Sequence, residues 1–474
     1  MRTTFHLKTL AVAIATLSVA SMTNAAGLDR SGQDVTAFFQ DGTYAEAVYT
    51  YIDADVSGYD SANTNPSQND YVRGDKTGDI AESYDFFRYG VKADINDTFS
   101  VGILYDEPFG AAAEYTQSNF VSQGDVDASI ASITNGAAPS LAAAQAGIGA
   151  LAAGETAGVL TPAQQAQLDG LRGAVAVAQA EASTAGENTN VEVRSQSLTG
   201  ILGMKFGANK NFQIYGGPVA QRTQSETKLR GLAYGPASGY TSNSNPDMDY
   251  GYIAGIAYSK PEIALKAALT YRSEIDHDIQ ISESYPLVAI RATAAGATPE
   301  QAAAAANRNS KYEITTPKSV NFDFQTGINP TTLATAKVRW VPWSDFVITP
   351  PLYNDTSKIS YGPDGLNLVE YKDDQWQVEL GLAKRLAPAL AVSGTVGWDS
   401  GAGNPVTSLG PVEGYYSVGL GAKYNVTENW AVSVGGKYLW FGDAQGQLPT
   451  GKIVADFEDN DGYIAGVKLS YQGK

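Results

Sequence analysis

Residues 416–440 read YSVGLGAKYNVTENWAVSVGGKYLW, and this stretch decides the fold class. From Tyr416 to Tyr424 the even positions are apolar or aromatic, and the odd positions are Ser, Gly or Lys. A short polar turn follows, and the alternation resumes from Trp430 to Trp440. Because successive side chains of a strand point to opposite faces, each half is a strand with one apolar face. Tyr and Trp at the ends of that face are typical of a strand that crosses a membrane between its two interfaces.

The same alternation recurs along the chain, in segments that include residues 250–258, 320–324, 376–382, 390–398 and 463–471. Counting such segments gives about fourteen strands, an even number, as expected when both ends of a single-chain barrel lie in the periplasm. Short turns alternate with long connections, as periplasmic turns alternate with extracellular loops. The predicted fold is an all-β transmembrane barrel with antiparallel strands.

The N-terminus has the three parts of a secretory signal. Arg2 and Lys8 precede an apolar stretch over residues 10–20, and small residues end at Ala25. We therefore expect a signal peptide over residues 1–25, a short luminal segment over 26–42 and the barrel over 43–474. No later segment offers the roughly twenty uninterrupted apolar residues that a membrane-spanning helix needs.

The composition agrees with an exported barrel. The chain has 49 Gly and 27 Tyr but only 17% charged residues, which favours many strands with aromatic edges over a packed helical core. It has no Cys, so strand closure rather than disulfides must supply stability. A net charge of −18 disfavours nucleic acid as a partner.

Two connections are rich in Ala. Residues 127–187 show helical spacing, with Thr161 and Pro162 at a helix start, and predict a helical extracellular insertion. A second Ala-rich loop over residues 287–310 contains Thr298, an N-cap ahead of Pro299 and Glu300. These loops are either solvated connections or an apolar landing groove for a hydrophobic solute.

No catalytic constellation stands out. His277 is the only histidine outside the signal, which argues against a His-based triad and against a multi-histidine metal site. The acidic residues fall mostly in loops. We expect no enzymatic activity, no cofactor and no metal.

The alternation also predicts cations on the inner wall of the barrel, at Arg88, Lys92, Lys205, Lys266, Arg272, Lys337, Arg339, Lys423, Lys437 and Lys468. A cationic wall would suit an anionic solute. The alternative is that these cations pair with inward acids such as Glu379 or lie near the rims of the barrel.

Short strings in order and spacing resemble the FadL-type outer-membrane transporters of long-chain fatty acids and other hydrophobic compounds. They are residues 26–27 (AG), 51–56 (YIDADV), 95–97 (IND), 109–115 (FGAAAEY), 268–274 (ALTYRSE), 343–346 (WSDF) and 398–400 (WDS). The resemblance spans nearly all of the chain after the signal.

This resemblance implies a barrel that captures a solute at an outer groove, passes it to an inner pocket and releases it sideways at a kink in the third strand. Pro108, Phe109 and Gly110 occupy the kink, where Pro removes a hydrogen-bond donor and Gly removes packing. Arg222, Lys228 and Arg230 fall near the ligand-binding arginine of the family, where a cation would pair with a carboxylate. A plain loop cation is the alternative.

The chain departs from the family at two places. Only residues 26–42 precede the first strand, so the N-terminal plug is largely missing and occlusion of the lumen is expected to be weaker or to come from elsewhere. The last aromatic residue, which the barrel-assembly machinery reads, is Tyr471 rather than the final residue.

We therefore predict a monomeric outer-membrane protein that passes hydrophobic small molecules such as fatty acids or hydrocarbons by passive diffusion, in contact with outer-membrane lipid. Two alternatives stay open. A general porin would have a continuous water-filled lumen, and a surface adhesion protein would use its Ala-rich loops to bind a partner. A lipid-modifying barrel enzyme is opposed by the missing nucleophile and base.

Overall fold

A computed structural model describes residues 28–473, so the predicted signal peptide over residues 1–25 lies outside the described residues. Among the helices of the described part, none combines the length and the apolar character needed to cross a membrane.

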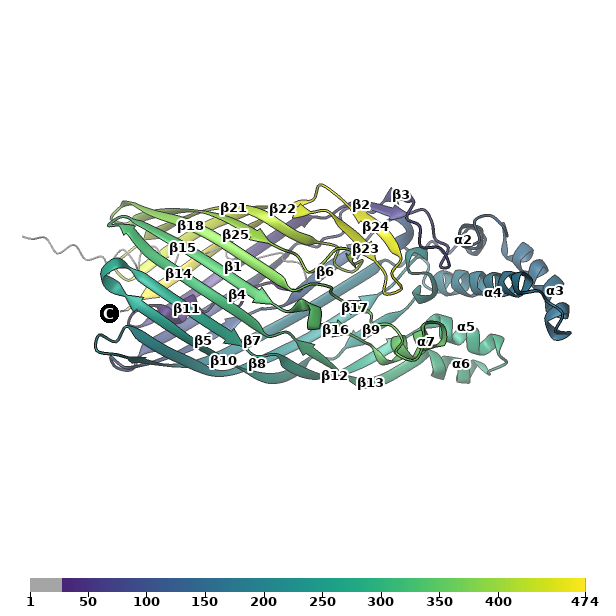
Figure 1. The fold of residues 1–474 in the computed structure, drawn as a ribbon, viewed down its shortest axis with the longest axis horizontal. Helices are drawn as coiled ribbons and strands as arrows, with labels where there is room; N and C mark the ends of the chain where they lie inside the picture. Colours follow the sequence, from purple (N-terminus) through teal and green to yellow (C-terminus); the bar gives the residue numbers. More distant parts are fainter. Residues whose placement is uncertain (1–27, 474) are drawn as a thin grey trace, which may run out of the picture.

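The chain forms one closed antiparallel barrel of fourteen strands, which confirms the predicted fold class (Figure 1). Ten strands are continuous: β1 (Tyr44–Asp55), β4 (Tyr84–Asp94), β7 (Thr189–Phe206), β8 (Phe212–Lys228), β15 (Thr332–Val341), β18 (Gln375–Ala387), β19 (Leu390–Asp399), β21 (Glu413–Asn425), β22 (Trp430–Gly442) and β25 (Asp461–Gln472). Four are each divided into two segments: β5 (Phe99–Asp106) with β6 (Gly110–Tyr115), β9 (Thr241–Ser244) with β10 (Asp247–Lys260), β11 (Leu265–Arg272) with β12 (Ile275–Ser284), and β13 (Asn307–Thr316) with β14 (Ser319–Asn329). The last strand pairs with the first, with Tyr44 opposite Gln472.

Closure of the barrel explains how the backbone of this chain is stable in lipid. The bilayer offers no hydrogen-bond partner, so every backbone N–H and C=O of a spanning strand must bond to a neighbouring strand. Along β21 the exposed side chains are Tyr416, Val418 and Leu420, whereas Ser417 and Lys423 are buried. The alternation in the sequence is therefore the division between the lipid face and the lumen.

The two ends of the barrel differ. Short turns such as residues 95–98 and 330–331 lie at the end that carries the C-terminus, and the α-helices of the described chain gather at the opposite end (Figure 1). By the rule that periplasmic turns are short, the helical end is extracellular.

The extracellular end carries a second sheet of five strands, β20 (Val406–Thr407), β23 (Ala444–Gln447), β24 (Ile453–Phe457), β2 (Gly58–Ser61) and β3 (Arg73–Lys76). A two-stranded sheet, β16 (Val347–Ile348) with β17 (Val369–Glu370), and the helix α7 (Pro351–Tyr361) lie nearby. Two 3-10 turns, η2 (Ser118–Phe120) and η3 (Leu232–Ala237), pack on each other there. Aromatic side chains from these loops fill the outer half of the lumen.

The Ala-rich loops are helical, as predicted. The first contains α2 (Val126–Ile133), α3 (Leu141–Thr156) and α4 (Pro162–Ala182), and the second contains α5 (Pro286–Ala294) and α6 (Pro299–Ala306). Thr161 and Thr298 each cap a helix through a capping box, with proline at the first helical position. The helices α3 and α4 project well beyond the rest of the molecule (Figure 1).

The described part of the N-terminal segment, residues 28–43, runs inside the lumen and contains the short turn η1 (Thr36–Phe39). Val35 and Phe38 are fully buried among inward residues of β5, β7, β8 and β10. A segment of this length therefore occupies the lumen, although the sequence led us to expect weaker occlusion.

Candidate functional site

The third strand is interrupted at the predicted kink. β5 ends at Asp106 and β6 begins at Gly110, and the three residues between them belong to neither. The ladder between β4 and β5 ends at the pair Tyr89 and Tyr105. Beyond it, β6 pairs with β7 rather than with β4, and contact with the chain before β4 resumes only at a bridge between Ala81 and Ala113. The barrel wall therefore lacks strand pairing between residues 84–88 and the kink.

The kink is held on its inner side by the luminal segment. The Arg30 N–H donates to the Pro108 carbonyl at 2.8 Å, and the Gly110 N–H donates to the Leu28 carbonyl at 2.8 Å. On the other side, the Phe109 N–H donates to Ser195 Oγ on β7 at 2.7 Å. The start of the described chain thus supplies the backbone partners that β4 does not.

The side chain of Arg30 lies in the interruption itself. Its guanidinium lies 4.0 Å from the centre of the Tyr84 ring and 3.9 Å from a Glu107 carboxylate oxygen. A Cβ added to Gly110 would lie 2.2 Å from the Arg30 guanidinium carbon, so a larger residue at this position would displace Arg30. Arg30 therefore closes the opening between β4 and the kink.

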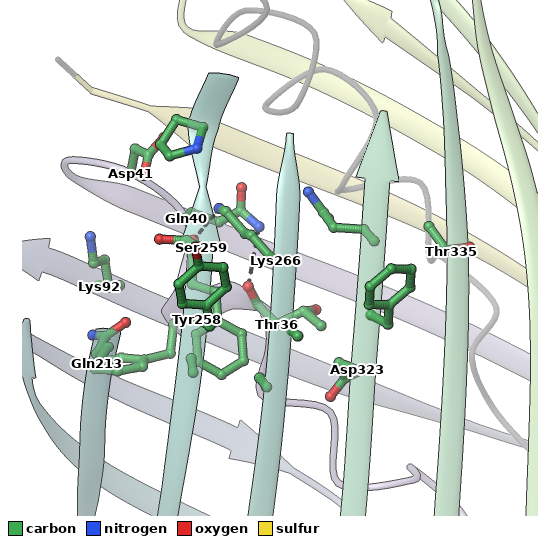
Figure 2. Close-up of a pocket in the computed structure, with 18 of the residues that line it drawn as sticks. Thr36, Gln40, Asp41, Lys92, Gln213, Tyr258, Ser259, Lys266, Asp323 and Thr335 are labelled. Atoms are coloured by element: carbon green, nitrogen blue, oxygen red, sulfur yellow. Dashed lines mark hydrogen bonds between the residues drawn. The ribbon is translucent and has the colours of Figure 1, made fainter. Parts of the chain in front are cut away.

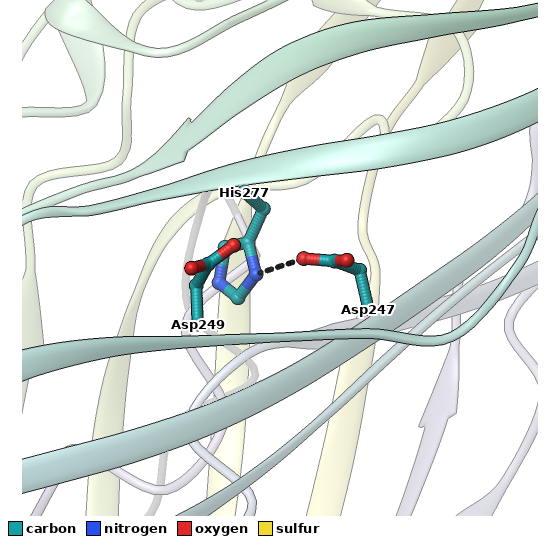
Figure 3. Close-up of side chains that lie close together, drawn as sticks. All are labelled: Asp247, Asp249 and His277. Carbon is teal, nitrogen blue, oxygen red and sulfur yellow. Dashed lines mark hydrogen bonds and ion pairs between the residues drawn. The ribbon is translucent and has the colours of Figure 1, made fainter.

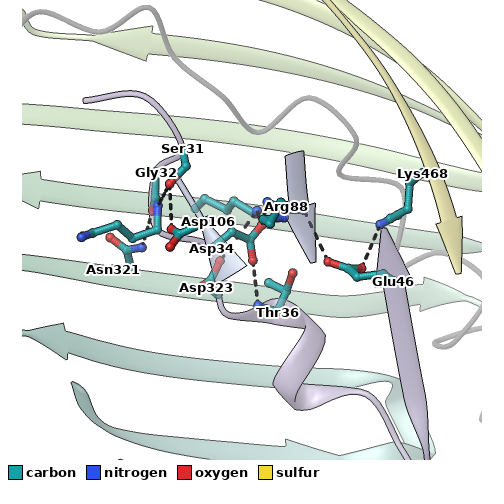
Figure 4. Close-up of polar contacts among 12 residues, drawn as sticks. Ser31, Gly32, Asp34, Thr36, Glu46, Arg88, Asp106, Asn321, Asp323 and Lys468 are labelled. Carbon is teal, nitrogen blue, oxygen red and sulfur yellow. Dashed lines mark hydrogen bonds and ion pairs between the residues drawn. The ribbon is translucent and has the colours of Figure 1, made fainter. Parts of the chain in front are cut away.

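Ion pairs anchor this segment to the inner wall. Asp29 accepts two hydrogen bonds from the Arg339 guanidinium, at 2.7 and 3.0 Å. Asp34 lies 3.0 Å from Lys337 and 3.5 Å from Arg88. Figure 4 shows the network that continues from Arg88 to Glu46 and on to Lys468.

These contacts decide between the two interpretations of the cationic wall. Besides the pairs above, Lys92 and Lys205 pair with Asp94, and Lys437 pairs with Glu379. Lys266 instead donates to the Phe39 carbonyl at 2.5 Å, and Arg272 to Thr199 at 3.0 Å. Most inward cations are therefore neutralised by acids, as the alternative predicted, and many hold the luminal segment.

Aromatic rings seal the lumen next to η1. Phe38, Phe39 and Tyr215 contact one another with ring centres 5.2 to 6.0 Å apart. A Cβ on the inward glycines Gly102 or Gly203 would lie 2.7 Å from a Phe38 ring atom, so only glycine leaves room for this ring. Toward the periplasm lies a vestibule of 660 Å³, shown in Figure 2. Its lining combines charged side chains such as Lys92, Lys266 and Asp323 with apolar ones such as Phe324 and Leu382.

A small apolar pocket lies at the extracellular end, between η3, α5, α7 and the turn after β23. Its lining includes Tyr234, Tyr285, Leu287, Tyr353, Leu368 and Leu448. Burial raises the pKa of Tyr285 and of Tyr353, so their hydroxyls stay neutral. The pocket volume is 70 Å³, well below the roughly 300 Å³ of a typical ligand site, so a long solute needs a loop to move. Within the described chain, the insertion over residues 127–187 contributes no side chain to this lining.

The three cations implied by the resemblance do not converge on one cavity. Arg230 is buried and donates to the carbonyls of Leu229 and Tyr240, to Thr241 and to Glu187. Lys228 pairs with Glu226 at 2.6 Å, and Arg222 lies on the exposed face of β8. Their ligand-binding role stays a prediction.

The residues that sequence reasoning missed are Arg30, Tyr84 and Asp29. Arg30 and Tyr84 are in contact across a strand interruption, and no periodic pattern links them. The pairing of Asp29 with Arg339 joins residues 310 positions apart. The only signal in the sequence for these residues was the short segment ahead of the first strand, which contains the adjacent charges Asp29 and Arg30.

A closed barrel with a lipid-facing exterior, a sealed lumen and an interrupted wall defines a membrane protein built to pass small molecules. The sequence matches the model of the family described as "Outer membrane protein transport protein (OMPP1/FadL/TodX)" over residues 13–472. The chain belongs to this family of outer-membrane transport channels for hydrophobic compounds, which confirms the resemblance and the location in the outer membrane. The family consists of transport channels, not enzymes.

Solved structures share the fold. A Pseudomonas aeruginosa FadL homologue superimposes with a TM-score of 0.59 at 14% identity, covering 95% of this chain and 96% of the other. The Pseudomonas putida toluene transporter TodX gives a TM-score of 0.52 at 12% identity, with 92% of each chain covered. A TodX variant described as a monoaromatic hydrocarbon channel gives 0.53 at 11%, covering 98% and 100%. Comparison with curated protein sequences finds no match.

Proposed function

We propose that this protein takes up long-chain fatty acids or similar hydrophobic solutes by passive diffusion and releases them sideways into the outer membrane at the kink. The observation that carries this proposal is the unpaired wall between residues 84–88 and the kink, closed by the Arg30 side chain rather than by a strand ladder. An opening that is closed by a side chain can open when Arg30 changes rotamer and the luminal segment moves. No continuous ladder of hydrogen bonds between strands has to break.

Sideways release also fits the energetics of an apolar solute. Each Å² of apolar surface exposed to water costs about 25 cal/mol. A route downward would bring the solute past Phe38 and Phe39 into a vestibule lined by Lys92, Lys266 and Asp323. A route through the wall delivers it into hydrocarbon instead, so the filled lumen and the missing strand pairing at the kink favour the same exit.

The extracellular apolar pocket is the capture site in this proposal. Its leucines and neutral tyrosines match the hydrocarbon chain of a solute, and Arg291 in the same lining can pair with a carboxylate. The helices α5 and α7 are the elements that must move to admit a chain. A monoaromatic hydrocarbon is the second candidate solute, because Tyr234, Tyr285 and Tyr353 offer ring faces.

Replacing Gly110 tests the exit. Gly110→Phe puts a ring where the Arg30 guanidinium now lies, and the matched control Gly200→Phe adds the same ring to the lipid face of β7. The added ring fills the opening and is fixed to the kink, whereas Arg30 can move aside with the luminal segment. We therefore expect uptake of labelled oleate by cells to fall to the background of cells lacking the protein for Gly110→Phe, and to stay at the wild-type level for the control. Heat-modifiable mobility on gels verifies that both barrels fold. Normal uptake by a folded Gly110→Phe barrel would rule out release at the kink.

A further inference from the structure

Two carboxylates and the only described histidine meet on the inner face of the barrel. Asp247 and Asp249 lie on β10, and His277 lies on β12 (Figure 3). One potential ligand atom from each side chain lies within 4.8 Å of the other two. The strands meet here at the ends of divided segments, where the Asn245 N–H donates to the Gln280 carbonyl at 2.9 Å.

The two aspartates differ from the inward acids that pair with the cations of the wall. Asp29, Asp34, Glu46, Asp94 and Glu379 each lie within 4.0 Å of a lysine or arginine. Among the described residues, neither Asp247 nor Asp249 has such a partner, and the one ion-pair contact recorded for Asp247 is to His277. Two carboxylates facing the same point with no basic side chain leave local negative charge that a cation would balance.

His277 is oriented toward this charge. Its side chain is 0% exposed, and its Nε2 lies 3.1 Å from Gln221 Oε1. Gln221 Oε1 also accepts a hydrogen bond from the Thr316 hydroxyl at 2.7 Å, which fixes the amide oxygen toward the ring. This arrangement assigns the ring proton to Nε2 and leaves a lone pair on Nδ1.

The Nδ1 atom then faces an acceptor rather than a donor. It lies 3.4 Å from Asp247 Oδ2, longer than the 2.7–3.2 Å of a good hydrogen bond. A lone pair and a carboxylate oxygen that face each other repel unless a metal ion or a proton lies between them. A histidine that ligates a metal usually donates its other N–H to an oxygen, as Nε2 does here toward Gln221.

We propose that Asp247, Asp249 and His277 form a binding site for a divalent transition-metal ion such as Zn²⁺, with Gln221 orienting the imidazole. Nitrogen and carboxylate ligands suit ions of this class better than Ca²⁺ or Mg²⁺, which take oxygen ligands. Three protein ligands leave a position for water, and the 27% exposure of the Asp247 side chain gives the ion access. The sequence alone predicted no metal, because it has a single histidine outside the signal and the two aspartates belong to another strand.

The site is tested with the full-length refolded barrel, stripped of metal by a chelator. Titration with Zn²⁺ is followed by calorimetry, and titration with Co²⁺ by its visible absorption, which reports nitrogen and oxygen ligation. We expect one saturable site in the wild-type barrel and its loss in the double variant Asp247→Asn/Asp249→Asn. The matched control Asp276→Asn/Asp278→Asn removes the same charge from the exposed face of β12 beside His277 and should bind as the wild type does.

A second variant tests whether Gln221 orients the His277 ring. It also tests the proposal if the double variant does not fold. Gln221→Leu leaves all three ligands in place and should weaken Zn²⁺ binding about 10- to 100-fold. Absence of saturable binding in the folded wild-type barrel would overturn the proposal. So would equal loss of affinity in the control pair, because the effect would then be one of general charge.

Discussion

Arg230 illustrates how a side chain acquires its role from partners that sequence does not reveal. Its position suggested a cation for a solute carboxylate, yet in the structure its guanidinium donates to two backbone carbonyls, to Thr241 and to Glu187. These bonds join the outer ends of β7, β8 and β9. These contacts give Arg230 a structural role and leave its guanidinium few free N–H donors for a ligand.

Arg230→Ala should therefore lower stability rather than affinity. It removes the Arg230 hydrogen bonds to the carbonyls of Leu229 and Tyr240, which keep their backbone donors from Gly239 and Leu229. A hydrogen bond from a charged donor contributes about 1.5–3 kcal/mol, so the loss of stability should be of that order. Lys228→Ala, which removes a half-exposed pair with Glu226, should cost about 0–1 kcal/mol. Urea unfolding of the refolded barrels measures both. A tenfold loss of fatty-acid binding without loss of stability would restore the ligand-binding role implied by the family.

At the scale of elements, the insertion over residues 127–187 divides into a base and a tip. At the base, buried Glu181 of α4 accepts a hydrogen bond from the Gly124 N–H at 3.1 Å, and Ile130 of α2 packs against Ala178. At the tip, the exposed pair of Arg172 and Glu155 links α4 to α3. The base belongs to the folded outer end, and the tip is a hairpin of helices in which buried Ala144 of α3 belongs to an apolar cluster with α4.

Replacing the tip, residues 139–170, by a short Gly/Ser linker distinguishes the roles proposed for this insertion. Because the tip lines no part of the outer pocket, we expect uptake of labelled oleate to stay at the wild-type level, with the barrel folded. A loss of uptake would instead identify the tip as a landing groove for the solute. Unchanged uptake together with a loss of cell adhesion would support the surface-binding alternative.

Local rules predicted these helices well, and the reason is physical. The starts at Thr161 and Thr298 depend on hydrogen bonds within three residues, which the sequence displays directly. The luminal segment follows no local rule, because Asp29, Asp34 and Phe38 are fixed by partners on distant strands. Its short length led us to expect that occlusion would be weaker or would come from elsewhere, and the sequence did not show that this segment itself packs in the lumen.

For the whole molecule, period-two alternation was enough to predict a barrel of about fourteen strands, and the lengths of the turns and loops predicted its orientation. The alternation records which face meets lipid, and closure follows because the bilayer satisfies no backbone group. It carries no information on which inward side chains meet across the lumen. The interruption at Pro108 was predicted from the family, but its closure by Arg30 and Tyr84 emerged only from the structure.

The conductance of the whole barrel separates the transporter from a general porin. The wild-type barrel in a planar bilayer should show little steady conductance, because residues 28–42 and the outer aromatic cluster fill the lumen. Deleting residues 28–40 should raise the conductance by removing Phe38, Phe39 and their ion pairs. Deleting residues 139–170 is the matched control and should change nothing. A large wild-type conductance that ignores fatty acid would establish the porin alternative.

The same few residues, Leu28 to Phe39, both close the side opening and block the lumen. Nutrient uptake and barrier function are thus coupled through one stretch of backbone. A mutation that frees this stretch to hasten release would also admit bulky water-soluble compounds. Cells selected for faster growth on a scarce hydrophobic carbon source through such mutations should become more sensitive to antibiotics that the intact outer membrane excludes.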